Sequence, residues 1–190
     1  FDVLDDGDGL DFFIPSADQI DPVERFGVSG PYIAMVLGAA HFTKRVPVIK
    51  WKELLAHMDP GRDVILIGGK DEQHLANALS SPHVQNACGL LSINQSASVL
   101  QQAKWVVAPD TGMMHIAAAL KKPIRSIWGS TLPEFGFWPF YGFKHQELKQ
   151  SFEIKGLYCR PCSRFGRDTC PQGHFRCMME QDMISIVHSV

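Results

Sequence analysis

The stretch Trp105-Val-Val-Ala-Pro-Asp110-Thr-Gly-Met-Met-His115-Ile-Ala-Ala-Ala-Leu120 decides the fold class of this chain. An apolar run ends at Pro-Asp-Thr-Gly, and an alanine-rich run typical of a helix follows at once. The pattern predicts a buried strand that leads into a helix N-terminus, where free backbone N–H groups attract phosphate or carboxylate. Thr111 and His115 are four residues apart and share one helix face. Asp110 falls at the carboxyl end of the strand, where open α/β sheets bind ligands.

A purely structural interpretation of this stretch is also open, in which Asp110 or Thr111 caps the helix and His115 belongs to the core. The binding interpretation gains support from the rest of the chain, because the same alternation continues. Apolar strands are predicted at residues 32–38, 63–69, 84–87, 105–108 and 124–128. Helices are predicted at residues 50–58, 71–79, 93–103 and 112–120. Strands without polar alternation, separated by helices, predict a Rossmann-like α/β domain: a parallel sheet with helices on both faces.

Composition limits the class of protein. The 190 residues suffice for one substantial domain or two small ones, with 45% hydrophobic and 20% charged residues. A net charge of −2 gives no electrostatic indication of DNA or RNA binding. No apolar run reaches the roughly 20 residues that span a bilayer. The chain begins with an acidic, polar segment that lacks both an initiator Met and a signal peptide, so we expect a preceding N-terminal portion.

The chain divides into three parts by composition. Residues 1–30 are rich in turn-forming residues and are predicted to be a linker or extension from a missing N-terminal domain. Residues 31–158 form the predicted Rossmann-like domain, with an aromatic, irregular region from residue 131 onwards. Residues 159–190 form a cysteine-bearing tail that ends in a predicted helix from residue 177.

Two further loops fall at the sheet edge that carries Asp110. After the first strand comes Gly38-Ala39-Ala40-His-Phe-Thr-Lys44-Arg45, where small residues let a ligand approach and a cation could neutralise a diphosphate. The alternative is a solvated basic turn. Gly68-Gly-Lys-Asp-Glu72 follows the second strand. It is not a GxGxxG motif, so NAD binding is poorly supported.

Glu72 has two interpretations. Its carboxylate could accept hydrogen bonds from a nucleotide, or it could complement the dipole of the helix that it begins. No GxSxG elbow supports nucleophilic serine catalysis. No metal-ligand spacing relates His41, His57, His74 and His83, and among these four His41 is the exception to a surface or core interpretation because it lies in the loop before Lys44.

The tail has four cysteines with the spacing C-x2-C-x7-C-x6-C. Cys159, Cys162, Cys170 and Cys177 lie in a short segment rich in Gly and Pro, with His174 between the last two. Such a set suits tetrahedral zinc, although a second CxxC pair is missing. Free thiols packed under the tail helix and disulfides are the alternatives, and an intracellular setting would argue against disulfides. Cys88 lies in an apolar context and is predicted to be a core residue.

The three loops and the cysteine-bearing tail together resemble those of family 9 glycosyltransferases, the heptosyltransferase-like enzymes of lipopolysaccharide assembly. The resemblance extends from about residue 30 and is most specific at Asp110-Thr-Gly-Met-Met-His115. Gly68-Gly-Lys-Asp-Glu72, Lys44-Arg-Val-Pro47 and the cysteine-bearing tail fall in the expected order. The resemblance implies one half of a GT-B glycosyltransferase, namely the C-terminal domain that binds the nucleotide-sugar donor.

The resemblance also implies roles for individual residues. Lys44 would contact the donor diphosphate, and the amides of Thr111 and Gly112 would hold phosphate oxygens. Asp110 would bind sugar hydroxyls, and His115 would support this loop or reach the donor. Glu72 would contact the nucleoside, and Leu91 would line the base pocket. Ala39 and Ala40 stand where heptose-transferring members often have hydroxyl residues, which weakens the assignment of ADP-heptose as the donor.

For the reaction, the resemblance implies an inverting sugar transfer that needs no metal, with the base in the missing N-terminal domain. It implies an ADP-heptose-like donor, a lipid-linked saccharide acceptor, and a cytoplasmic enzyme peripheral to the inner membrane. We therefore expect the isolated chain to bind donor weakly and to catalyse no transfer. The alternatives are a GT-B-like nucleotide-sugar epimerase and a zinc-stapled binding module without catalytic activity.

Overall fold

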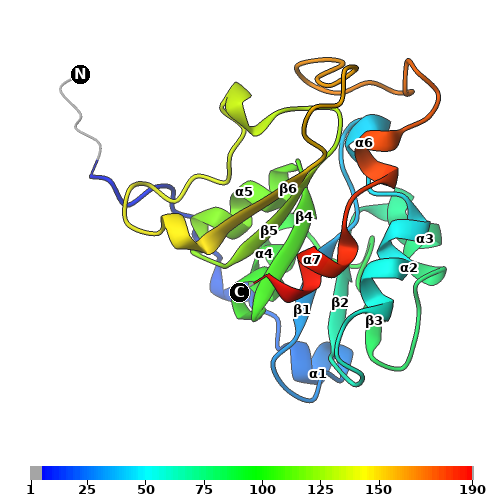
Figure 1. Cartoon of the computed structure of the whole chain (residues 1–190). Helices are drawn as coiled ribbons and strands as arrows, with labels where there is room; N and C mark the ends of the chain where they lie inside the picture. Colours follow the sequence, from blue (N-terminus) through cyan, green and yellow to red (C-terminus); the bar gives the residue numbers. More distant parts are fainter. Residues whose placement is uncertain (1–5, 190) are drawn as a thin grey trace.

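The computed structural model describes residues 6–189, and these form a six-stranded, fully parallel sheet with helices on both faces (Figure 1). The strand order is β3-β2-β1-β4-β5-β6. Residues 1–5 of the predicted extension and residue 190 of the predicted tail lie outside the described residues. The strands are β1 (Ile33–Val36), β2 (Val64–Ile67), β3 (Val84–Asn86), β4 (Trp105–Pro109), β5 (Ile124–Trp128) and β6 (Lys149–Glu153). The predicted Rossmann-like fold class is confirmed.

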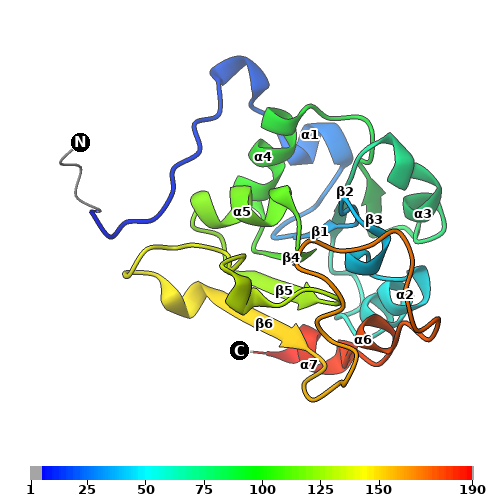
Figure 2. The same ribbon diagram turned by 90° about the horizontal axis from the view of Figure 1, so that it is seen from above.

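The helices form two layers. Figure 2 shows α1, α4 and α5 on one side of the sheet and α2, α6 and α7 on the other. Their bounds are α1 (Pro22–Phe26), α2 (Val48–Ala56), α3 (Gln73–Asn77), α4 (Ile93–Gln102), α5 (Gly112–Ala119), α6 (Arg176–Met179) and α7 (Met183–His188). Short 3-10 helices occupy Ser16–Asp18, Phe42–Lys44, Lys70–Glu72, Pro133–Phe135 and Gln146–Leu148.

The central strands are buried on both faces because their side chains alternate between two hydrophobic clusters. On β1, Ile33 and Met35 enter the cluster beneath α2 and α7, whereas Ala34 and Val36 enter the cluster beneath α4 and α5. Burial of side chains on both faces explains why the strand segments are continuous apolar runs without polar alternation. These buried strands therefore hold the loops that follow them in fixed positions along the carboxyl edge of the sheet.

The region from residue 131 to 158 differs from its prediction as an irregular segment. It contains β6, which pairs in parallel with β5 from Lys149 to Glu153. Every residue of β6 is half-buried, since this strand lies at the edge of the sheet. Its sequence, Lys-Gln-Ser-Phe-Glu, lacks the apolar run that marks the inner strands, so the pattern could not show it.

Two predicted helices are shorter than expected. The segment predicted as a helix over residues 71–79 is a 3-10 turn at Lys70–Glu72 followed by the five-residue α3. The tail contains α6 and α7 in place of one helix from residue 177. Asp182 separates these two helices and caps α7 by accepting a hydrogen bond from the Ser185 amide at 3.0 Å.

The described part of the predicted extension is tied to the domain. The Ile20 amide donates a 2.9 Å hydrogen bond to the Ser98 hydroxyl, and Gln102 donates to the Ile20 carbonyl at 2.8 Å. Lys121 donates to the Leu10 carbonyl at 2.8 Å. These bonds join residues before β1 to α4 and to the end of α5. Among the described residues, no helix has the length and apolar character that crossing a membrane requires.

Candidate functional site

A cavity of about 410 Å³ opens at the carboxyl end of the sheet. It lies at the topological switch point, where the chain leaves β1 toward β2 on one side and β4 toward β5 on the other. Open α/β sheets bind ligands at such a point because the loops diverge there. Six of the nine predicted donor-binding residues line the cavity: Ala39, Ala40, Glu72, Leu91, Thr111 and Gly112.

The N-terminus of α5 forms one wall of this cavity. Thr111 is the N-cap residue in an extended conformation, and no side chain caps the helix there. The exposed Gly112 begins the helix, and a Cβ at this position would meet nothing within 4 Å. Uncapped backbone N–H groups beside an open space are suited to an anionic ligand. The capping alternative for Thr111 is therefore wrong, because its hydroxyl makes no capping bond.

Lys44 and Asp110 meet beside the cavity and do not line it. Lys44 Nζ lies 2.8 Å from Asp110 Oδ2, with side-chain exposures of 13% and 6%. The hydroxyl of Thr131, which is fully buried, donates to the same carboxylate oxygen at 2.9 Å. The loop after β1 and the loop after β4 are thus joined by a buried ion pair, with a hydroxyl from the loop after β5 as a third member.

His115 lies one turn into α5, partly buried and outside the cavity lining. Burial lowers the pKa of its imidazole, the nearby Asp110 carboxylate raises it, and the Lys44 ammonium lowers it, with a net downward shift. The imidazole is therefore neutral at pH 7. Because His115 lies near Asp110 and outside the cavity, it suits a residue that supports the loop after β4.

Glu72 lies at the start of its turn and also in the cavity lining. Its Oε2 accepts a 2.9 Å hydrogen bond from the Gly69 amide and so caps its own 3-10 turn. Its side chain also lines the cavity, packed against the glycines of two loops. A Cβ at Gly38 would lie 3.0 Å from the Glu72 carboxyl carbon, and one at Gly68 would lie 2.9 Å from its Cβ. The two glycines therefore provide the space that Glu72 occupies.

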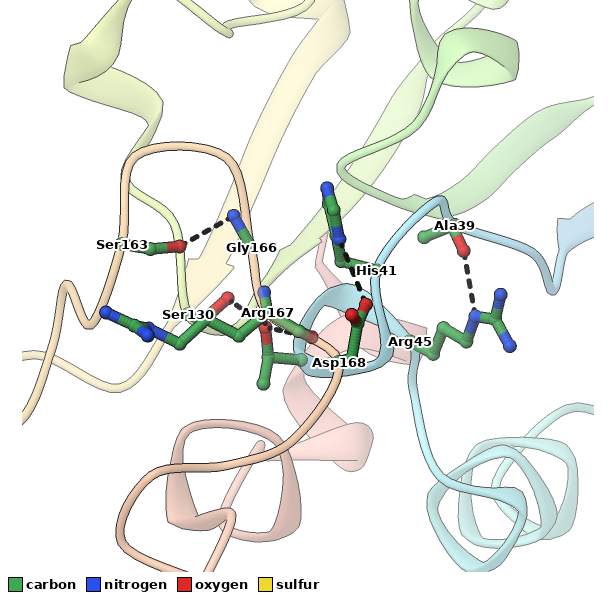
Figure 3. A network of polar contacts seen from close by, with 9 residues as sticks. Ala39, His41, Arg45, Ser130, Ser163, Gly166, Arg167 and Asp168 are labelled. Atoms are coloured by element: carbon green, nitrogen blue, oxygen red, sulfur yellow. Dashed lines mark hydrogen bonds and ion pairs between the residues drawn. The ribbon is translucent and has the colours of Figure 1, made fainter.

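The loop after β1 is held by its own side chains, as Figure 3 shows. Arg45 Nε donates to the Ala39 carbonyl at 2.8 Å, so this cation shapes the loop. His41 Nδ1 lies 3.4 Å from Asp168 Oδ1 on the surface. Lys44, rather than Arg45, is the cation of this loop that contacts Asp110.

The four tail cysteines gather around a second, very small cavity. Cys159, Cys162, Cys170 and Cys177, together with His174, line a space of about 10 Å³. All four cysteines are free thiols, and the Cys159 sulfur lies 3.9 Å from His174 Nε2. Burial and the other three thiols raise the pKa of Cys177 to about 12, with Arg160 lowering it.

This cysteine cluster has the donor types that zinc prefers. In their present positions, no three His, Cys, Asp or Glu side chains within residues 6–189 are arranged to hold a metal ion. The disulfide alternative is not supported, because all four of these cysteines are free thiols in the structure. Cys88 is buried in the core beside β2, as predicted, and burial raises the pKa of its thiol to about 12.

A model of glycosyltransferase family 9 (heptosyltransferase) matches residues 11–162. The chain belongs to this family. Lipopolysaccharide heptosyltransferase 1 of Pseudomonas aeruginosa is 35% identical over 135 residues, which are 70% of this chain and 36% of the relative. The curated relatives of this family 9 chain are named heptosyltransferases, and heptosyltransferases are glycosyltransferases.

Two solved structures support the fold assignment of this family 9 chain. The E. coli ADP-heptose lipopolysaccharide heptosyltransferase II matches with a TM-score of 0.64 at 21% identity, over 90% of this chain and 52% of that chain. The E. coli heptosyltransferase WaaC with ADP matches with a TM-score of 0.57 at 29% identity, over 65% of this chain and 38% of that chain. The chain thus spans between about a third and about half of the length of these proteins.

Sequence reasoning missed several cavity residues of this family 9 chain. They are apolar or small side chains from β1, β2, α4 and α5: Val36, Ile67, Ile93, Ser96, Met113 and Ile116. One signal was present, because Ser92 and Gln95 form a capping box that places the start of α4 at the cavity. The apolar residues gave no signal, since a cavity wall and a core face have the same composition.

Proposed function

We propose that this chain is the C-terminal, nucleotide-sugar-binding domain of an inverting glycosyltransferase that transfers a heptose-like sugar to a lipopolysaccharide-type acceptor. One observation carries the proposal: the cavity at the switch point is bounded by an uncapped helix N-terminus and adjoins the buried Lys44–Asp110 pair. Amide groups and a lysine suit a diphosphate, and a carboxylate suits sugar hydroxyls. The E. coli heptosyltransferase WaaC structure is a complex with ADP, and the other matching enzyme is an ADP-heptose lipopolysaccharide heptosyltransferase, which agrees with this ligand class.

In this proposal the cavity divides into two parts, one for the nucleoside and one for the diphosphate. The apolar part, lined by Ile67, Leu91 and Ile93, receives the base, and Glu72 accepts hydrogen bonds from the nucleoside. The diphosphate lies against the α5 N-terminus, with the small Ala39 and Ala40 opposite. Small side chains at this point let the phosphates approach the backbone closely.

Lys44 changes partner in this arrangement. The diphosphate carries more negative charge than the single carboxylate of Asp110, so it draws the ammonium group toward the cavity. Asp110 is then free to accept hydrogen bonds from the donor sugar. His115 stays neutral behind the loop and supports it.

The reaction requires an acceptor hydroxyl to attack the anomeric carbon while a base takes its proton and the nucleoside diphosphate leaves. Lys44 and the helix-end amides stabilise the negative charge on the leaving diphosphate. We place the base in the N-terminal domain of the intact enzyme and assign this chain no proton transfer. The intact enzyme would act at the cytoplasmic side of the inner membrane, where a lipid-linked acceptor lies.

Isothermal titration calorimetry of the chain with ADP, UDP, GDP and ADP-heptose tests the proposal. We expect one diphosphate to bind selectively, and Lys44→Ala to weaken that binding by at least tenfold, since the substitution removes a charge-assisted contact to phosphate. The matched control is Lys52→Ala, which removes an exposed lysine from α2. Failure of every nucleotide to bind a chain that circular dichroism shows to be folded would contradict the proposal.

We also propose that Cys159, Cys162, Cys170 and Cys177 hold one structural zinc ion. All four thiols line the same small cavity, and their spacing includes a CxxC pair. Binding would require the side chains to rotate toward that cavity. The metal would stabilise the tail and takes no part in sugar transfer.

A further inference from the structure

The tail segment is bonded to the loop after β1, which carries Lys44, and to the loop after β5, which carries Thr131. This segment, orange in Figure 1, passes over the carboxyl ends of the strands. Figure 3 shows how Arg167 of the tail meets the loop after β1. The Thr43 hydroxyl donates to the Arg167 carbonyl at 3.1 Å and accepts from the Arg167 amide at 2.8 Å. Ser130 donates to the same hydroxyl at 2.8 Å, which joins the loop after β5 to the contact.

Arg160 makes a second bridge, this time to the backbone of the loop after β5. Its guanidinium donates to the Gly129 carbonyl at 2.6 Å and to the Thr131 carbonyl at 2.8 Å. Glu153 at the end of β6 lies 2.5 Å from the same guanidinium, and the Arg160 side chain is only 5% exposed. A planar donor fork held by a half-buried carboxylate fixes two carbonyls at once, which a lysine could not do.

Thr131 connects this bridge to the site. Its backbone carbonyl is held by Arg160, and its hydroxyl donates to Asp110 Oδ2 at 2.9 Å. Asp110 Oδ2 also contacts Lys44, at 2.8 Å. When the donor diphosphate draws Lys44 away, the Thr131 hydroxyl is the contact that keeps the Asp110 carboxylate in place.

The loop after β5 has little freedom to adjust. A Cβ at Gly129 would lie 2.7 Å from the Thr43 carbonyl oxygen and 2.6 Å from the Met178 side chain. The backbone of Gly129 is therefore packed directly against the residue before Lys44. A displacement of this loop would move the Thr131 hydroxyl relative to Asp110.

We propose that Thr131 and Arg160 are positioning residues for the donor sugar: Arg160 fixes the backbone of Thr131, whose hydroxyl orients the Asp110 carboxylate toward the sugar hydroxyls. The inference rests on the proposed function, because it assumes that Asp110 meets the sugar. It adds a role for the cysteine-bearing tail, since Arg160 lies between Cys159 and Cys162. Neither residue lines the donor cavity, and the role assigned to each acts through Asp110.

Thr131→Val tests the hydroxyl, with ADP-heptose and ADP as the probes in calorimetric titrations. We expect Thr131→Val to weaken ADP-heptose binding about tenfold and ADP binding less than twofold, since one hydrogen bond to a charged group is lost. Thr131→Ser keeps the hydroxyl and should restore ADP-heptose affinity. Ser98→Ala removes a buried hydroxyl that bonds to Gln19 and Ile20, away from the site, and serves as the matched control.

Arg160 is tested with two variants. Arg160→Lys retains the charge and loses the fork, so we expect the same selective loss of ADP-heptose affinity. The double variant Glu153→Gln/Arg160→Gln removes both buried charges together, which avoids an unpaired carboxylate and keeps the chain folded. Crystal structures of the Thr131 and Arg160 variants give a second measurement, in which we expect the Asp110 side chain to change rotamer.

The outcomes separate the inference from the proposed function. A wild-type chain that binds neither ADP nor ADP-heptose contradicts the proposed function. A wild-type chain that binds both, with Thr131→Val and Arg160→Lys indistinguishable from it, overturns only the inference. An unchanged Asp110 rotamer in the variant structures overturns the inference irrespective of any binding result, and an equal loss of ADP and ADP-heptose affinity does so too.

Discussion

The ammonium group of Lys44 and the carboxylate of Asp110 lie 2.8 Å apart in an almost fully buried ion pair, although 66 residues separate them in the sequence. The pair joins the loop after β1 to the loop after β4. These loops lie close together because β1 and β4 are neighbouring strands in the sheet. In this structure each group neutralises the charge of the other.

Breaking this pair should destabilise the chain. Lys44→Met leaves a buried carboxylate without its cation, and we expect the free energy of unfolding to fall by about 3 kcal/mol in urea denaturation. The double variant Lys44→Met/Asp110→Asn should recover most of that loss. Arg176→Gln, which breaks an exposed pair with Glu180, is the control and should change stability by less than about 1 kcal/mol. An unchanged free energy of unfolding in Lys44→Met would show that the pair does not stabilise the fold.

His115 should give stability a dependence on pH between its folded pKa and about 6.5, the unfolded value. Because burial lowers the folded pKa, the unfolded chain binds more protons in this window, and stability rises with pH across it. Unfolding free energies measured from pH 5 to 7.5 should show a slope that His115→Asn reduces. His57→Gln, at an exposed position, should leave the slope unchanged. If the slope persists in His115→Asn, groups other than His115 cause the pH dependence of stability.

Gly68→Ala should disturb Glu72. The added methyl group would lie 2.9 Å from the Glu72 Cβ and 3.0 Å from the Cys88 sulfur, both in confined positions. We expect a loss of about 1–3 kcal/mol in unfolding free energy, as for other overpacked sites. Gly30→Ala, where nothing lies within 4 Å, is the matched control. Equal stabilities of the two variants would mean that Glu72 moves aside freely.

Zinc in the tail is testable by metal analysis. We expect about one zinc per chain in protein purified without chelator, and less than a tenth of that in Cys159→Ser/Cys162→Ser, because tetrahedral sites need all four ligands. Cys88→Ser should retain the metal, since Cys88 lies in the core away from the tail. A metal-free, folded chain in which the four tail thiols react with a thiol reagent would contradict zinc and favour free cysteines. Loss of that reactivity without metal would favour disulfides.

The isolated chain should transfer no sugar. We assign the proton-accepting base to the N-terminal domain, so incubation of the 190-residue chain with ADP-heptose and a lipopolysaccharide acceptor should yield no product by mass spectrometry. The intact enzyme assayed in parallel is the positive control. Measurable turnover by the chain alone would place the base within these residues.

Much of the fold follows from local patterns. The strands β1, β2 and β4 are apolar runs, and β5 spans the predicted residues 124–128 although it contains Arg125 and Ser126. The N-termini of α4 and α5 were also predictable, since Ser92 and the Pro-Asp-Thr-Gly junction mark them. By contrast, β6 is recognised only through its pairing with β5, because a half-buried edge strand has no distinctive composition.

The sequence by itself determined the fold class, the edge of the sheet that carries the site, and six of the residues that line the cavity. These depend on periodicity and on loop chemistry, which act over a few residues. Only the tertiary structure decided that Lys44 pairs with Asp110, that Thr131 joins them, and that Arg160 of the tail holds Thr131. Such contacts arise when strand order and packing bring distant loops together, and no local pattern encodes that proximity.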